Sequence, residues 1–269
     1  MRIGLICSFY NEELYIKDFY FSLKQFVNPC DIYFINDCST DKSESILTNF
    51  HPQENIIRNE KNIGQGNSIL KGINHLKIQG YDYAITMDCD LQHDPKEIKQ
   101  FVSKLKSNLN LDVIVGSRYQ KNSKEIGTQS KIRFLANVLF CDLFNKFYKC
   151  DISDCFSGYL LLNLDKFNNI LLSSSYAWII DFWKFVLRNN YSFEEITIDR
   201  IYLNTIRDFK GYYKSNIEIV ADLLNTFKRN SLIDNHEYLN IITSHFTEYE
   251  MIYSKENITI DKLILDISK

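Results

Sequence analysis

Short apolar runs alternate with amphipathic stretches through the first half of the chain. Each run is bounded by polar or turn-forming residues, which is the pattern of buried strands, and the predicted strands cover residues 2–9, 31–36, 55–58, 83–87 and 112–115. Between them, apolar residues recur at spacings of three and four, and the predicted helices cover residues 12–26, 43–50, 66–78 and 95–109. Asp94 followed by Pro95 is typical of a helix start. This alternation predicts an α/β fold with a mainly parallel sheet flanked by helices.

The second half of the chain has a more mixed pattern. We expect helices near residues 130–148 and 176–188, a strand at 159–162 and an extended stretch at 193–203. From residue 217 onward the chain is predicted to be helical and ends in a short apolar run at 258–267. We therefore expect one large domain over residues 1–215 and a small C-terminal helical extension over residues 216–269.

Composition and charge narrow the classes of function. The 269 residues are 45% hydrophobic and 24% charged, with a net charge of −3, so the chain has no global positive field for nucleic acid. Its seven cysteines form no Cys-x-x-Cys pair, which favours reduced thiols in a cytoplasmic protein. Because no uncharged apolar stretch reaches the roughly 18 residues of a membrane span, we expect a cytoplasmic protein, at most peripheral at the inner face of the membrane.

Polar residues follow four of the five early strands. Ligands of open parallel sheets bind at the carboxyl ends of the strands, so these residues are the first candidates for a site. One edge of the predicted sheet would collect carboxylates, an amide, hydroxyls and an arginine. The four clusters are residues 10–13, 37–41, 88–93 and 116–119.

Asp88 and Asp90 form the most informative cluster. Two carboxylates that leave a strand two residues apart, with Gln92 next, supply the oxygen ligands that Mg²⁺ or Mn²⁺ prefers, and they leave positions open for substrate phosphates. A divalent ion there would neutralise a diphosphate leaving group. The alternative is an ordinary turn that caps the helix beginning at Pro95.

Two further clusters have candidate binding roles. Asp37 could accept hydrogen bonds from a base imide or a ribose hydroxyl, or else form an Asx turn; we expect Asp37 on a ligand and Asp41 in a structural role. Gly64 and Gly66, in Asn-x-Gly-x-Gly, would let the backbone approach a ligand closely. This loop lacks the Lys-Ser/Thr of a nucleotide triphosphatase, so ATP hydrolysis is not expected.

Taken in order, these residues resemble glycosyltransferase family 2, with its GT-A fold, and most nearly its branch of polyprenyl-phosphate (dolichol-phosphate) sugar synthases. The resemblance covers roughly residues 1–203. The matching motifs are Tyr10-Asn11-Glu12-Glu13, Asn36-Asp37-Cys38-Ser39-Thr40-Asp41, Asn62-x-Gly64-x-Gly66, Asp88-Cys89-Asp90-Leu91-Gln92-His93-Asp94-Pro95, Gly116-Ser117-Arg118-Tyr119, Arg133-x-x-x-Asn137 and Asp154-x-x-Ser157-Gly158-Tyr159.

The resemblance implies a role for each matched residue. Tyr10, Glu12 and Asp37 would hold the nucleoside, while Asp88, Asp90 and Gln92 would arrange the metal ion and the diphosphate. Arg118 would face the acceptor or a phosphate, and Arg133 would help to bind an acceptor phosphate. The implied reaction is inverting sugar transfer from a nucleoside-diphosphate sugar, most simply a UDP-sugar, with Mg²⁺ or Mn²⁺ acting as a Lewis acid.

The chain departs from the family pattern at three places. Asn36 stands where an Asp-Asp pair has its first acid, and Ser8 stands where proline is frequent. The family's basic loop over the diphosphate has different spacing here, with Lys214 as the candidate cation. Membrane-anchored members continue into transmembrane helices and this chain does not, so we expect a glycan or lipid-linked acceptor, with a polyprenyl phosphate as the alternative.

A hydroxyl acceptor would require a general base near the anomeric carbon. Asp154, which opens Asp-x-x-Ser-Gly-Tyr, and Asp181, which interrupts an apolar helix, are the candidates. Asp181 could instead face water. If the acceptor is a phosphate no base is needed, and Asp154 would orient Arg118 or Arg133.

Other functional classes remain as rivals. A nucleotidyltransferase would need a basic glycine-rich loop after the first strand, where this chain has Glu12 and Glu13. A catalytically inactive module that binds sugar nucleotides would not need Asp88 and Asp90. The C-terminal helices could form a homodimer surface, and the aromatic-rich residues 134–147 could contact lipid or pack in the core.

Overall fold

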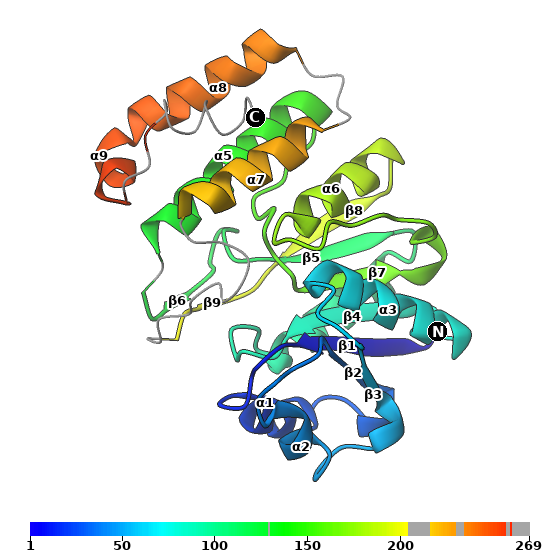
Figure 1. Ribbon diagram of the computed structural model, residues 1–269. Helices are drawn as coiled ribbons and strands as arrows, with labels where there is room; N and C mark the ends of the chain where they lie inside the picture. The colour runs from blue at the N-terminus through cyan, green and yellow to red at the C-terminus, as the bar shows by residue number, and fades with distance from the viewer. Residues whose placement is uncertain (129, 204–215, 230–233, 257–258, 260–269) are drawn as a thin grey trace.

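Seven strands form one sheet that runs through the molecule (Figure 1). The computed structural model describes residues 1–128, 130–203, 216–229, 234–256 and 259. The spatial order of the strands is β3-β2-β1-β4-β7-β5-β8, and only β7 is antiparallel to its neighbours β4 and β5. The strands are β1 (Ile3–Phe9), β2 (Ile32–Asn36), β3 (Ile56–Arg58), β4 (Tyr83–Asp88), β5 (Val113–Ser117), β7 (Leu160–Asn163) and β8 (Phe193–Thr197). The expected mainly parallel α/β sheet is confirmed.

The helices connect and cover these strands. They are α1 (Ile16–Leu23), α2 (Ser43–Leu47), α3 (Gln65–Ile78), α4 (Ile98–Ser107), α5 (Lys131–Tyr148), α6 (Trp178–Arg188), α7 (Asn216–Lys228), α8 (Asn235–Glu248) and α9 (Glu250–Tyr253). The Asp94 carboxylate accepts the Lys96 N–H at 2.9 Å, so the expected cap is present, but it begins a 3₁₀ turn (Pro95–Glu97) and α4 starts after it. A short parallel pair of β6 (Glu125–Ile126) with β9 (Arg200–Ile201) was not expected.

Side chains of the strands alternate between two hydrophobic cores, as a period of two requires. Ile6 and Val113 point to the core that contains α3, α5 and α6, whereas Cys7 and Ile114 point to the core that contains α1 and α4. Because both faces of the sheet are covered, β1, β2, β4, β5 and β7 are apolar at most positions, which is why short apolar runs located them, whereas β8 at the edge is half-buried and carries two glutamates.

The C-terminal helices share a core with the sheet. Val220, Phe227, Tyr238 and Phe246 are buried in the same hydrophobic cluster as α5 and α6, and Figure 1 shows α7 lying along α5. The ammonium group of the buried Lys184 on α6 donates hydrogen bonds to the last carbonyls of α7, at Thr226 (2.8 Å) and Arg229. The helical character expected after residue 216 is present in the described part, whereas the apolar run 258–267 lies almost wholly outside it.

His245 makes the stability of this helical region dependent on pH. Burial lowers the pKa of His245 to about 4, and its ring nitrogen lies 2.8 Å from the Tyr253 hydroxyl. The unfolded chain therefore binds one more proton than the folded chain between about pH 6.5 and pH 4, and stability falls as the pH drops through that window. We expect a loss of up to about 3 kcal/mol.

Urea unfolding of the wild type and of His245→Gln at several pH values in this window measures the effect. The decline should be clearly shallower in His245→Gln, while His236→Gln, which removes an exposed histidine of the same helix, should follow the wild type. Equal declines in all three proteins would contradict this assignment.

Candidate active site

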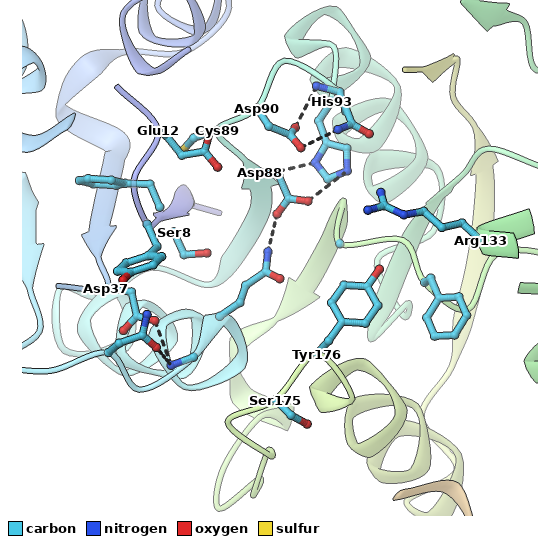
Figure 2. A pocket seen from close by; sticks show the side chains of 18 of the residues that line it. Ser8, Glu12, Asp37, Asp88, Cys89, Asp90, His93, Arg133, Ser175 and Tyr176 are labelled. Atoms are coloured by element: carbon cyan, nitrogen blue, oxygen red, sulfur yellow. Dashed lines mark hydrogen bonds and ion pairs between the residues drawn. The ribbon is translucent and has the colours of Figure 1, made fainter. Parts of the chain in front are cut away.

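A cavity of about 320 Å³ opens at the carboxyl ends of the parallel strands. Its walls come from the segments that follow β1, β2, β4 and β5, from the start of α3, from α5 and from the segment before α6. Figure 2 shows carboxylates on one side of this cavity and Arg133 and Tyr176 on the other. Most of the residues singled out from the sequence line it: Tyr10, Glu12, Asp37, Gly64, Asp88, Asp90, Gln92, Arg118 and Arg133.

Hydrogen bonds join the loop after β1 to the loop after β2. The Asn11 N–H donates to Ser39 Oγ at 3.0 Å, and Asn11 Oδ1 accepts the Thr40 N–H at 2.8 Å. Asn11 and Cys38 both have positive φ, 56° and 64°, so the two strands are followed by sharp turns in corresponding places. These contacts hold Tyr10 and Glu12 at the cavity. Asp41 accepts hydrogen bonds from Glu13 and Ser43 and does not line it.

Asp37 is 4% exposed and supports the loop between β3 and α3. Its two oxygens accept hydrogen bonds from the backbone N–H groups of Ile63 and Gly64 and from the Asn59 amide, each at 2.9 Å. A carboxylate has about four lone-pair positions, so this arrangement leaves about one for a ligand. The position expected to bind a nucleoside is therefore also the support of the loop between β3 and α3.

Asn36 explains one departure from the family pattern. It is fully buried, its amide donates to Glu44, and its Oδ1 accepts the Ser39 N–H at 2.7 Å. An ionised aspartate in this place could not donate to Glu44 and would lie next to a second carboxylate. The Asn36 amide can therefore donate to the Glu44 carboxylate, which an aspartate could not do.

Gly64 and Gly66 are required by the protein's own packing. A Cβ on Gly64 would lie 1.9 Å from the Ser174 carbonyl oxygen, and Gly64 has φ of +83°. A Cβ on Gly66 would lie 2.5 Å from the Cβ of Trp178. The two glycines were expected to let a ligand approach the backbone, but the segment before α6 makes this close approach instead. Gly64 lines the cavity and Gly66 does not.

Asp88 is held by groups from three parts of the chain. Gln65 Nε2 donates to its Oδ1 at 2.6 Å, and Gln65 Oε1 accepts the Trp178 indole N–H at 3.2 Å. His93 is 4% exposed and stacks on Tyr159. Because its Nδ1 accepts the Asp88 N–H at 3.0 Å, the neutral ring carries its proton on Nε2, 3.9 Å from Asp88 Oδ2. His93 therefore supports the carboxylate.

Asp90 and Gln92 form a compact turn. Asp90 is 6% exposed and accepts both the Gln92 N–H at 3.0 Å and its side-chain amide at 2.9 Å. Leu91 between them has φ of 64°, a left-handed conformation that is costly for a leucine and orients both side chains.

Asp88, Asp90 and Gln92 fit a divalent ion that takes its remaining ligands from water and from the substrate phosphates. Among the described residues no group of three or more His, Cys, Asp or Glu side chains could hold a metal ion. Mg²⁺ commonly uses one or two carboxylates and completes its shell with water and substrate phosphates. Asp88 and Asp90, with the Gln92 amide oxygen beside them, match that requirement.

Arg118 is fixed by a buried ion pair with Asp154. Asp154 is 0% exposed, and it accepts hydrogen bonds from Arg118 Nε at 2.8 Å, from Nη2 at 2.9 Å and from the Arg118 N–H at 2.9 Å. Burial disfavours the charge, but Asp154 outweighs it and keeps the pKa of Arg118 above its ordinary value. The base candidate Asp154 is not among the residues that line the cavity; it holds Arg118, which is.

Arg133 and Tyr176 form the wall opposite the carboxylates (Figure 2). Burial raises the pKa of Tyr176, and the positive charges of Arg133 and Arg118 oppose that rise. A smaller cavity of about 70 Å³ adjoins this wall between α5 and α7. It shares Gln92, Arg118, Arg133, Phe156 and Tyr176 with the main cavity, and Ile132, Ala136, Ile219, Val220 and Leu223 give it an apolar lining.

Asp181 lies elsewhere. It accepts hydrogen bonds from Ser173 and forms an ion pair with Arg229 at 2.9 Å, and it does not line the cavity. The expectation that it serves as a base does not fit this position, because its carboxylate joins α6 to the end of α7. Lys214 falls outside the described residues.

Sequence reasoning missed several residues of the site. Gln65, Tyr176, Ser174 and Phe156 line the cavity. Gln65 could have been suspected because it lies inside the glycine motif and begins α3. Phe156 lies inside the Asp154-x-x-Ser157-Gly158-Tyr159 motif and Tyr176 at the start of a predicted helix, but neither pattern marked them as site residues. The fold brings both of them and Ser174 to the cavity.

Two known proteins are similar in sequence to part of this chain. A 125-residue match to the undecaprenyl-phosphate 4-deoxy-4-formamido-L-arabinose transferase of Photorhabdus laumondii is 30% identical and covers 44% of this chain and 37% of that protein. The prophage bactoprenol glucosyl transferase homolog of Escherichia coli K12 is 25% identical over 179 residues, 64% of this chain and 55% of that protein. The chain thus spans about a third to a half of the length of these two relatives.

A solved structure confirms the fold. Glucosyl-3-phosphoglycerate synthase from Mycobacterium tuberculosis, in complex with Mn²⁺, UDP-glucose and phosphoglyceric acid, has a TM-score of 0.61 at 14% identity, over 84% of this chain and 78% of that one. No helix among the described residues has the length and apolarity to cross a membrane. The model of glycosyl transferase family 2 matches residues 5–171, more than half of the chain, and the chain belongs to that family.

Proposed function

We propose that this protein transfers a sugar, with inversion, from a UDP-sugar to an acceptor that carries a phosphate, and that it uses Mg²⁺ or Mn²⁺. The observation that carries the proposal is the division of charge in the cavity. Glu12, Asp37, Asp88 and Asp90 follow β1, β2 and β4, while Arg118 and Arg133 lie across from them.

The carboxylate side suits a metal-bound donor. Asp88, Asp90 and the Gln92 amide oxygen would hold the ion, which would supply Lewis-acid stabilisation of the departing diphosphate. Gln65 and His93 keep Asp88 in place, and Tyr10 and Glu12 lie where a nucleoside would be bound. The structural neighbour that contains Mn²⁺ and UDP-glucose supports this choice of donor.

The arginine side suits a phosphate acceptor. A phosphate oxygen is already ionised near neutral pH and needs no general base, whereas a hydroxyl acceptor does. Both base candidates form ion pairs with arginines, Asp154 with Arg118 and Asp181 with Arg229. Arginine also suits phosphate, because its planar donors can bind two oxygens at once.

The apolar cavity between α5 and α7 suits the group that carries the phosphate. Ile132, Ala136 and Leu223 would contact an apolar chain whose phosphate lies against Arg118 and Arg133. A polyprenyl phosphate has this chemistry. Similarity in sequence to an undecaprenyl-phosphate sugar transferase and to a bactoprenol glucosyl transferase homolog supports it. We therefore prefer the lipid phosphate, which was the alternative, to the glycan or lipid-linked acceptor expected from the sequence.

Incubation of the protein with UDP-sugars, Mn²⁺ and undecaprenyl phosphate in detergent tests the reaction. Sugar should move into the lipid fraction as UDP is released. Transfer only to hydroxyl acceptors without phosphate would contradict the proposed acceptor.

Asp90→Asn should abolish the Mn²⁺-dependent part of UDP binding. A ligand that binds only the folded state raises its melting temperature, so the thermal shift produced by UDP should depend on Mn²⁺ in the wild type and not in the variant. Asp82→Asn, at the opposite end of β4, is the matched control and should behave as the wild type. An unchanged Mn²⁺-dependent shift in Asp90→Asn would contradict the metal site.

Asp154→Asn should destabilise the fold by about 3–5 kcal/mol, because it leaves the Arg118 guanidinium without its buried counterion. Asp181→Asn should cost clearly less, since the side chain of Arg229 is 52% exposed and can be hydrated. Urea unfolding measures both. Similar small losses in the two variants would show that the Asp154 ion pair does not hold the site.

Arg133→Gln should raise the KM for undecaprenyl phosphate by about tenfold to a hundredfold, because it removes a charge-assisted hydrogen bond to the acceptor. The UDP thermal shift should be unchanged. Arg58→Gln, an exposed arginine paired with Glu44 at 3.5 Å, is the control. An unchanged KM in Arg133→Gln would argue against the acceptor phosphate at this wall.

A further inference from the structure

Residues 121–128 and 130–134, nearly all of them exposed, lie beside the arginine wall and form what we call the β6–α5 surface. Two large apolar side chains are exposed on it, Ile126 (49%) and Phe134 (39%). Phe134 directly follows Arg133 in the sequence, and Ile126 pairs with Ile201, which lines the main cavity. The surface therefore borders the acceptor side of the site.

Positive charge is concentrated on the same surface. Lys121, Lys124, Lys131 and Arg133 lie within it, and Glu125 is its one acidic residue, although the whole chain has a net charge of −3. Glu125 lies 3.5 Å from Arg200, so that acid is already paired. Within the described part of the chain, no ion pair neutralises the three lysines, all of which are exposed.

The β6–α5 surface is held rigidly to the rest of the site. The Tyr202 N–H donates to the Ile126 carbonyl and the Arg200 N–H to the Lys124 carbonyl, each at 2.8 Å. Gly127 has φ of +86°, and a Cβ there would lie 1.9 Å from the Tyr202 carbonyl oxygen. The Phe134 ring packs against Tyr119 at 5.7 Å. The exposed apolar and basic groups thus have a fixed position relative to the cavity.

We propose that the β6–α5 surface docks onto an anionic lipid membrane. Exposed apolar side chains surrounded by lysines are the combination that binds the headgroup region, where the apolar groups insert and the cations meet acidic lipids. A nucleic acid would use the charges and could stack a base on Phe134, but it would leave Ile126 in water. The inference rests on the proposed function, because docking here would bring the arginine wall to a phosphate that a membrane lipid carries.

Co-sedimentation with vesicles tests the docking without donor or acceptor. The protein should bind vesicles of equal parts phosphatidylcholine and phosphatidylglycerol, bind pure phosphatidylcholine weakly, and lose binding as salt is raised. The triple variant Lys121→Gln, Lys124→Gln, Lys131→Gln should bind the mixed vesicles at least about tenfold more weakly. The double variant Ile126→Ser, Phe134→Ser should also bind more weakly.

The matched control is Ile78→Ser, Leu171→Ser, which removes two side chains that are 82% and 88% exposed away from this surface and should bind as the wild type does. The UDP thermal shift with Mn²⁺ verifies that each variant is folded. Equal binding to both kinds of vesicle, or unchanged binding by the triple and double variants, would overturn the proposal, as would retention on single-stranded DNA without binding to vesicles.

The two proposals fail in different ways. Vesicle binding through this surface, without sugar transfer to undecaprenyl phosphate, would leave the docking intact and overturn the proposed acceptor. Transfer to undecaprenyl phosphate in detergent, without binding to vesicles, would leave the acceptor intact and overturn the docking.

Discussion

The carboxylate of Asp37 supports much of the site. It accepts two backbone N–H groups and one amide from the segment between β3 and α3, and so holds that segment against the carboxyl end of the sheet. Gln65 follows directly and reaches Asp88, while Gly64 and Gly66 admit the segment that carries Tyr176 and Trp178. Loss of the Asp37 carboxylate would therefore disturb both walls of the cavity, not only a nucleoside contact.

Much of the fold was predictable from local pattern. Strands buried on both faces produce short apolar runs, and β1 to β5 lie within one or two residues of their predicted positions. The predicted first helix began too early, at residue 12 instead of Ile16, because the Asn11 N–H bonds to the loop after β2 and the Glu12 N–H bonds to Ser43 at the start of α2. β6 has two residues, too few to form a period, and it exists because β9 lies beside it.

The site likewise contains residues that local pattern predicts and residues that depend on distant parts of the chain. Asp88, Asp90, Arg118 and the residues after β1 and β2 line the cavity because strand ends of one sheet must meet at one edge. Asp154 was expected to orient Arg118 or Arg133 if the acceptor is a phosphate, and it pairs with Arg118, whereas the Arg229 partner of Asp181 was not expected. Arg118 and Arg229 lie 36 and 48 residues away in sequence, and long-range ion pairs leave no trace in local spacing.

The antiparallel strand β7 sets the width of the site. It lies between β4, which ends at Asp88, and β5, which ends next to Arg118, so these ends are two strand spacings apart, roughly 10 Å. Gly158 precedes β7 at this edge, and even a Cβ there would lie 3.5 Å from the Asp88 carboxylate. The spacing between the backbone positions of Asp88 and Arg118 is therefore set by the sheet. Substitutions in the surrounding loops can change which molecules enter the cavity. They leave the separation between the ends of β4 and β5 unchanged.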